Sequence, residues 1–262
     1  MSSMDPLFTT NEISILLVDD NKVNQFLGKQ ILRNIGFTNV KVASDGPTAL
    51  KMINDFEFDI LLTDVEMPGM NGYELTTAVR QLGSVKNEIT IIALTANATS
   101  EEQAHAMQLG MNDYLSKPYT PEELQTTLQK HIKPKGGFFI SEYSTIPDAR
   151  HSPVSSIYTM FNGNKDDVRI LLLMLKAQIP ECMDLLKTGI LKSEWQKAFS
   201  AAHKLKSSVK LFNIDSLFKK AANIAELARN ENDLQEIPGL YDELHSELQG
   251  ILALINQELE EL

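Results

Sequence analysis

Residues 13–36 read ISILLVDDNKVNQFLGKQILRNIG, a short apolar run followed by an amphipathic stretch with helical spacing. The same alternation recurs along the chain up to about residue 133. Continuous apolar runs of this length suit strands that are buried on both faces of a parallel sheet. The alternation therefore predicts an α/β fold, a doubly wound five-stranded parallel sheet with helices on both faces. The expected strands are residues 13–18, 39–43, 58–64, 89–95 and 112–118.

The second half of the chain has a different pattern. Residues 135–152 contain Gly, Pro and Ser without a sustained period, so they are predicted to form a linker. Only helical spacing follows, and four long helices joined by short loops predict an all-α bundle. The expected helices are 166–189, with a possible kink at Pro180, 193–212, with Ser193 as its cap, 214–230 and 239–262. The predicted organisation is a sheet domain at 12–134, the linker, and a helical bundle at 153–262.

Composition excludes several classes of function. The net charge of −11 argues against a nucleic-acid-binding surface, which would need clustered Lys and Arg. Cys182 is the single cysteine, so neither an internal disulfide nor a cysteine-based zinc cage is expected. The N-terminal sequence lacks the features of a signal peptide, and no apolar run is long enough to span a bilayer. We therefore expect a soluble cytoplasmic protein without direct membrane contact.

Three carboxylates stand where predicted strands end. Asp19 and Asp20 follow the first strand, and Asp64 closes the third. In a parallel α/β sheet, ligands bind outside the carboxyl ends of the strands, so these side chains meet if the two strands are neighbours. Clustered carboxylates repel one another unless a cation neutralises them, and Mg2+ prefers oxygen ligands. Taken singly, an Asp pair after a strand is often only a helix cap or a turn.

Two further residues fall at strand ends on the same edge. Thr95 closes the fourth strand, and Lys117 follows the fifth and precedes Pro118. A lysine binds a phosphoryl group as a point charge, and a threonine hydroxyl donates a hydrogen bond to a phosphoryl oxygen. With a metal ion present, these groups would support in-line attack of an aspartate on a phosphoryl group. The order of these residues along the strands favours this interpretation over separate structural roles.

The first half closely resembles the receiver domains of two-component response regulators, most of all receivers attached to hybrid sensor kinases. The resemblance lies in ILLVDDN, LLTDVEMPGMNGYEL, IIALTANA and GMNDYLSKP, within about residues 13–133. It implies a flavodoxin-like fold and Asp64 as the phosphoacceptor. It further implies that Asp20 and Asp64 bind Mg2+ directly, that Asp19 helps through water, and that Glu66 supplies its backbone carbonyl.

The same resemblance implies a conformational switch. Thr95 and Lys117 would contact the phosphoryl group, while the small side chain of Ala96 would leave the site open. Tyr114 matches the aromatic position of the family's switch: Thr95 moves toward the phosphoryl group and the ring of Tyr114 turns into the vacated space. The alternative for Tyr114 is an ordinary half-buried strand aromatic. The side chain of Glu66 is expected to tune the hydrolysis of the phosphate.

His203 raises a separate question, because it could be a core residue, a metal ligand or a nucleophile. On a helix with about 100° per residue, it falls beside the polar residues Gln196, Ser200, Lys206, Ser207 and Lys210, with Phe199 at the margin. The apolar face of that helix comprises Trp195, Ala198, Ala202, Leu205, Val209 and Phe212. The pattern therefore predicts an imidazole that faces water. The chain has no HxxxH or HExxH pattern that would favour a metal site.

The stretch AHKLKSS, residues 202–208, resembles the histidine phosphotransfer domains, and the resemblance covers roughly residues 153–262. It implies that His203 carries a phosphoryl group and that Lys206 assists it. The family usually has glycine at the positions of Ser207 and Asn213. Serine is small enough to keep the histidine accessible, and an exposed neutral imidazole can attack a phosphoaspartate.

The two halves together predict a phosphorelay protein that carries phosphoryl groups rather than a turnover enzyme. The expected partners are a sensor histidine kinase and other receiver or histidine phosphotransfer domains. The chain would be either an independent relay component or the cytosolic tail of a hybrid kinase, since it has no ATP-binding motif. One alternative is an interaction protein in which phosphorylation of Asp64 regulates docking and His203 is inactive. Another is a metal-dependent phosphatase, which the adjacent pair Asp19 and Asp20 disfavours.

Overall fold

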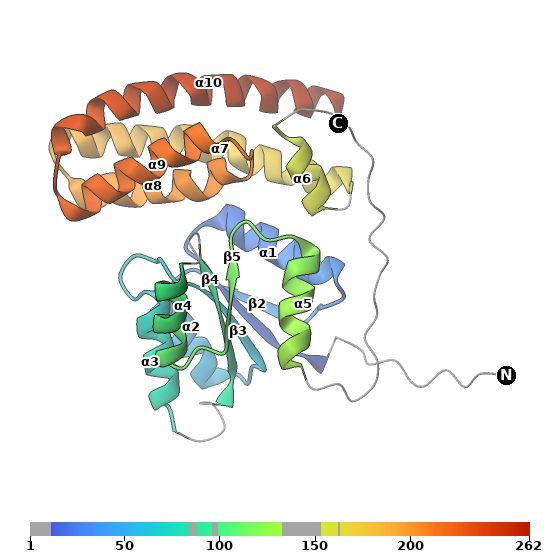
Figure 1. Ribbon diagram of the computed structural model, residues 1–262. Coiled ribbons are helices and arrows are strands. Elements are labelled where there is room, and N and C mark those ends of the chain that lie inside the picture. Colours follow the sequence, from blue (N-terminus) through green and yellow to red (C-terminus); the bar gives the residue numbers. More distant parts are fainter. Residues whose placement is uncertain (1–11, 84–87, 96–98, 133–152, 162) are drawn as a thin grey trace. The chain divides into compact units, whose positions relative to one another are not determined.

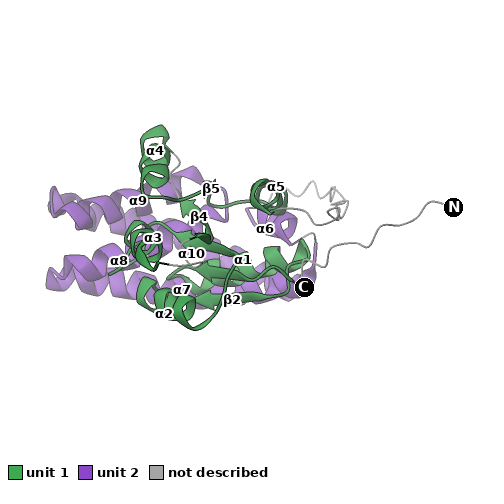
Figure 2. Ribbon diagram, turned by 90° about the horizontal axis from the view of Figure 1, so that it is seen from below, with its two compact units in different colours: residues 1–144 green, residues 145–262 purple. Residues whose placement is uncertain are grey.

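The computed structural model describes residues 12–83, 88–95, 99–132, 153–161 and 163–262. The chain divides into two compact units, Met1–Ser144 and Thr145–Leu262 (Figure 2). The predicted linker, residues 135–152, and Ala96 lie outside the described residues. Each unit is therefore described by itself.

The first unit contains a parallel sheet with the strand order β2-β1-β3-β4-β5 (Figure 1). Each of the expected strands is present, and their buried side chains explain why the sequence runs are continuously apolar. β1 pairs with both β2 and β3, so the first and third strands are neighbours, as the argument for a carboxylate cluster requires. The strands are β1 (Ile15–Val18), β2 (Val40–Ala43), β3 (Ile60–Asp64), β4 (Thr90–Thr95) and β5 (Asp113–Ser116).

Helices follow the strands and begin at side chains that cap them. A side-chain oxygen of the residue before each helix accepts a backbone N–H of the first turn, which satisfies a donor that the helix itself leaves open. The capping residues are Asn21, Asp45, Asn71, Thr99 and Thr120. The helices are α1 (Lys22–Asn34), α2 (Gly46–Asp55), α3 (Gly72–Gln81), α4 (Ser100–Gln108) and α5 (Pro121–His131).

The sheet separates two buried layers, because successive side chains of a strand point to opposite faces. Leu16 and Val18 of β1 belong to the layer that contains buried residues of α2, α3 and α4. Ile15 and Leu17 of the same strand are also buried. Helices thus cover both faces, and polar groups of the first unit gather at the ends of the strands.

The second unit is helical. Four long helices form it, as predicted, and the described residues add the short helix α6 and the 3-10 turn η3. Its core comes from apolar side chains of every long helix, such as Leu175, Ala202, Ile224 and Leu248. The elements are α6 (Ser155–Met160), α7 (Lys165–Lys192), α8 (Trp195–Lys210), α9 (Asp215–Asn230), η3 (Leu234–Glu236) and α10 (Ile237–Glu261).

The boundary between α7 and α8 differs from the prediction. Ser193 does not cap α8; it ends α7 with a left-handed φ of 54°, and Glu194 precedes α8 without a side-chain cap. The turn is tight because Gly189 lies against α8, where an added Cβ would lie 2.9 Å from the backbone nitrogen of Ala198. Pro180 lies inside α7, which continues through it as one helix.

Among the described helices, none combines the length and the apolar character that crossing a membrane requires.

Candidate functional site

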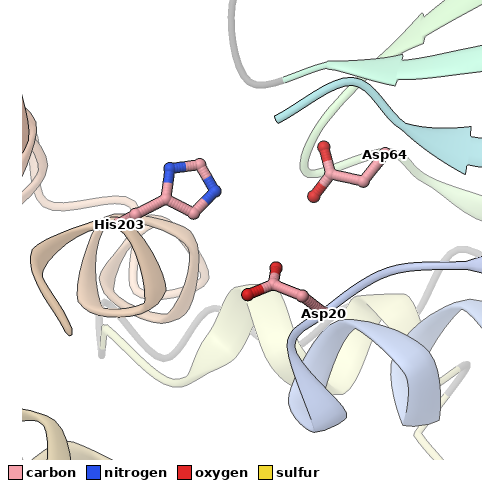
Figure 3. Close-up of side chains that lie close together, drawn as sticks. All are labelled: Asp20, Asp64 and His203. Carbon is pink, nitrogen blue, oxygen red and sulfur yellow. The ribbon is translucent and has the colours of Figure 1, made fainter. Parts of the chain in front are cut away.

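The carboxyl ends of β1 and β3 bring the predicted acidic residues together. Val18 is paired with Thr63, so Asp19 and Asp64 are the next residues on two adjacent strands. The carboxylates of Asp20 and Asp64 have oxygen atoms within 4.8 Å of each other (Figure 3). The sheet register thus produces the cluster that the spacing predicts.

Lys117 joins two of the carboxylates. Its Nζ lies 2.6 Å from Oδ2 of Asp19 and 2.6 Å from Oδ2 of Asp64. Its backbone N–H donates to the carbonyl of Thr95 at 2.7 Å, which fixes the segment after β5 beside the end of β4. A single ammonium group is thus held between two acids at the end of the sheet.

Burial and charge act in opposite directions on these groups. Burial raises the pKa of both Asp19 and Asp64, and the charge of Lys117 opposes this rise. Burial alone would lower the pKa of Lys117, but the two carboxylates raise it above its ordinary value. The lysine therefore remains a cation. With Asp20 included, three carboxyl groups surround one ammonium group, and this oxygen-rich donor set fits a hard divalent cation.

The remaining contacts orient the two paired acids. Oδ1 of Asp19 accepts the N–H of Asn21 at 2.9 Å and Nδ2 of Asn24 at 3.1 Å. Oδ1 of Asp64 accepts the N–H of Glu66 at 3.2 Å. Asn21 and Asn24 were not predicted as residues of this site, although both follow the acid pair at the start of α1. Metal binding by the carbonyl of Glu66 stays a prediction.

Gly72 is a third residue at this site that was not predicted from the sequence. Its N–H donates to the carbonyl of Val65 at 3.0 Å, which ties the start of α3 to the residue after the proposed phosphoacceptor. An added Cβ would lie 2.3 Å from the carbonyl oxygen of Asp64. Only glycine allows this approach, and its place directly after the capping residue Asn71 was the available sequence signal.

The predicted switch residues lie on adjacent strands. Thr95 ends β4 and is 9% exposed. Tyr114 on β5 is opposite Ala93, and its half-buried ring packs against the core layer beneath α2, α3 and α4. The proposed exchange of positions between the two residues stays a prediction.

In the second unit, His203 and Lys206 lie one turn apart on α8. The expectation that the imidazole faces water stays a prediction. Phe199, predicted at the margin of this face, lies beside the imidazole: its ring centroid is 5.8 Å from that of His203, with an angle of 44° between the rings (Figure 3 draws the imidazole). The hydroxyl of Ser207 donates to the carbonyl of His203 at 3.4 Å.

Asn213 occupies a backbone conformation that favours glycine. Its φ is 54°, in the left-handed region that asparagine tolerates better than most residues. Nearby, the buried hydroxyl of Ser208 donates to Oε1 of Gln178 at 2.6 Å and links α8 to α7. Because asparagine tolerates the left-handed conformation, the turn after α8 forms although position 213 is not glycine.

Comparisons with known proteins find two families. The response regulator receiver domain matches residues 15–129, and the Hpt domain matches residues 170–257. The chemotaxis protein CheY of Pseudomonas aeruginosa is 40% identical over 118 residues, which are 45% of this chain and 94% of that protein. The sensor histidine kinase RcsC of Escherichia coli is 39% identical over 129 residues, 49% of this chain but only 13% of the kinase.

Solved structures also match the first unit. The chemotaxis protein CheY4 of Vibrio cholerae shares 31% identity, with 46% of this chain and 98% of that chain covered and a TM-score of 0.43. The receiver domain of the sensor histidine kinase PA1611 from Pseudomonas aeruginosa, described with a magnesium ion in its active site cleft, shares 39% identity. That match covers 45% of this chain and 96% of that chain, with a TM-score of 0.42.

Proposed function

The chain belongs to the response regulator receiver family and carries an Hpt domain, and from this premise we propose a two-module relay in which Asp64 and His203 each carry a phosphoryl group. The matches to both domain types support a phosphorelay role and do not favour an interaction protein with an inactive bundle. The proposed partners are a sensor histidine kinase and other receiver or Hpt domains. The single observation that carries the receiver assignment is Lys117, paired at 2.6 Å with both Asp19 and Asp64.

In the receiver, Asp64 is the proposed nucleophile. A carboxylate oxygen attacks phosphorus in line; the new O–P bond forms as the bond to the leaving group breaks, and the leaving group departs with its electron pair. Lys117 then exchanges its contact with the Asp64 carboxylate for one with a phosphoryl oxygen, and the Thr95 hydroxyl donates to another. Asp20, Asp64 and the carbonyl of Glu66 would hold Mg2+, with Asp19 acting through water. The ion would neutralise charge on the phosphoryl oxygens.

In the bundle, His203 is the proposed carrier. An unprotonated ring nitrogen attacks the phosphorus of an aspartyl phosphate; an N–P bond forms, the O–P bond breaks, and the electron pair leaves with the carboxylate. Lys206 would pair with the phosphoryl oxygens from one turn away. The reverse transfer has the same atoms and charges, so the arrangement serves a relay in either direction.

Labelling with acetyl phosphate and Mg2+, followed by mass mapping, tests both sites. We expect Asp64→Asn to abolish aspartyl phosphate, whereas Asp55→Asn, on the exposed surface of α2, retains it. His203→Gln should leave Asp64 labelled but remove acid-labile, base-stable phosphate from the bundle, and His245→Gln on the exposed face of α10 is its control. Absence of phosphohistidine with every phosphorylated receiver offered would favour the interaction protein instead.

A further inference from the structure

The ring of Phe199 contacts two residues that the sequence separates. His203 lies one turn later on the same helix, with a centroid separation of 5.8 Å. Arg229 belongs to α9, which lies beside α8 (Figure 1), and its Cζ is 5.9 Å from the Phe199 ring centroid. Contacts therefore run from a guanidinium group on α9, through an aromatic ring, to the imidazole on α8.

This arrangement restricts the motion of the imidazole. A histidine on the surface of a helix samples several rotamers, and a reaction in which the ring attacks phosphorus requires one of them. A neighbouring ring excludes the rotamers of the imidazole that would collide with it. The angle of 44° between the rings shows that the imidazole is tilted against Phe199 and not stacked face to face with it.

Phe199 is itself half-buried and needs support. A guanidinium group over an aromatic ring is attracted by the negative charge density of the ring face. Arg229 lies on the exposed surface of α9. Its contact with Phe199 gives this residue a defined role in holding the ring against His203.

We propose that Phe199 is a positioning residue for phosphoryl transfer at His203 and that Arg229 acts through it. The proposal rests on the proposed function, because it assumes that His203 carries phosphate. It goes beyond that function by assigning a role to two residues outside the AHKLKSS stretch. It also predicts that the two residues act as one unit, so their effects on the transfer rate are not additive.

The test uses two full chains. The donor carries His203→Gln and is phosphorylated at Asp64; the acceptor carries Asp64→Asn, so phosphate on the acceptor can reside only at His203. We expect Phe199→Leu in the acceptor to slow transfer roughly tenfold, whereas Phe199→Tyr, which retains a ring, stays within about twofold of the parent. Arg229→Gln should slow transfer by a smaller factor, and should have no further effect once Phe199→Leu is present.

A spectroscopic measurement separates positioning from a general loss of structure. The ring protons of His203 should lose their aromatic ring-current shift in Phe199→Leu and keep it in Phe199→Tyr. The matched control is Phe218→Leu, which removes another aromatic ring of the α8–α9 pair, one that contacts Lys210 instead; transfer should be unchanged.

Two results would overturn the proposal while leaving the relay intact: transfer at the parental rate in Phe199→Leu, or an equal effect of Arg229→Gln with and without Phe199→Leu. If the unmodified acceptor never gains phosphate although the donor is labelled, the assignment of His203 fails, and the positioning role fails with it.

Discussion

Replacing Gly72 by alanine tests whether close packing at the end of β3 positions the proposed phosphoacceptor. Helix propensity alone predicts that the change stabilises α3 by up to about 1 kcal/mol. The structure predicts the opposite, because the new Cβ would lie 2.3 Å from the carbonyl oxygen of Asp64, and ordinary contact begins at 3.4 Å, so the two must separate by about 1.1 Å. Overpacking of this kind costs about 1–3 kcal/mol.

The same displacement would disturb the hydrogen bond from the Gly72 N–H to Val65, worth about 1 kcal/mol. We therefore expect a net loss of about 2 kcal/mol in the unfolding free energy of the first unit, with slower labelling of Asp64 by acetyl phosphate. Gly250→Ala in α10 is the matched control, because its Cβ would meet nothing within 4 Å, and it should stabilise the second unit by about 0.5–1 kcal/mol.

Urea unfolding followed by hydrogen exchange and mass spectrometry measures each unit separately, and the single tryptophan, Trp195, reports on the bundle by fluorescence. The separate readouts are needed because a chain of two units does not unfold in one step. If Gly72→Ala is as stable as the parent, or more stable, the close approach of α3 to Asp64 is not a constraint and the reasoning is wrong.

Three further predictions follow from other contacts. Lys117→Met leaves buried carboxylates without their shared cation, so we expect the unfolding free energy of the first unit to fall by about 3 kcal/mol. Mg2+ should stabilise this variant more than the parent, which thermal unfolding with and without the ion measures. Burial would raise the pKa of Asp113, but hydrogen bonds from His131, the Tyr114 backbone and Lys130 hold it below its ordinary value of 3.8. Its ionised form therefore stabilises the fold above that value, and this contribution is lost as pH falls through the lower folded-state pKa. Asp113→Asn should destabilise the unit near neutral pH, and the difference in unfolding free energy should vanish in acid, once the pH is below the folded-state pKa. Asn213→Gly should keep or raise the stability of the bundle, whereas Asn213→Val should lower it by about 1–2 kcal/mol, because a β-branched residue is strained at a φ of 54°. Unfolding followed by tryptophan fluorescence measures both variants, and equal stability of the two would contradict the backbone argument.

The strands and the acidic edge could be predicted because their signals are local. Each strand is a continuous apolar run, and a parallel sheet places the residues after β1 and β3 at one edge whatever the details of packing. Asp19, Asp64 and Lys117 therefore meet as expected. The four long helices were equally predictable, since their apolar spacing spans several turns.

The errors concern features that depend on distant contacts. Serine is a good helix N-cap, but Ser193 instead ends the preceding helix, because Gly189 brings α7 against α8 and the chain must turn there. Position 72 requires glycine because the end of β3 lies against it. That contact comes from the packing of α3 against the sheet, which the periodicity of the helix does not indicate.

Asn21 forms two hydrogen bonds that connect α1 to the acidic site. Its side chain accepts the N–H of Val23 at the start of α1, and its own N–H donates to the carboxylate of Asp19. Fraying of the first turn of α1 would consequently weaken the hydrogen bond that orients Asp19. By thermodynamic reciprocity, an ion bound by these acids would stabilise that turn. The backbone amide of Val23 therefore reports on ion binding: its exchange with deuterated solvent should slow when the ion is added, even when the chain is not phosphorylated.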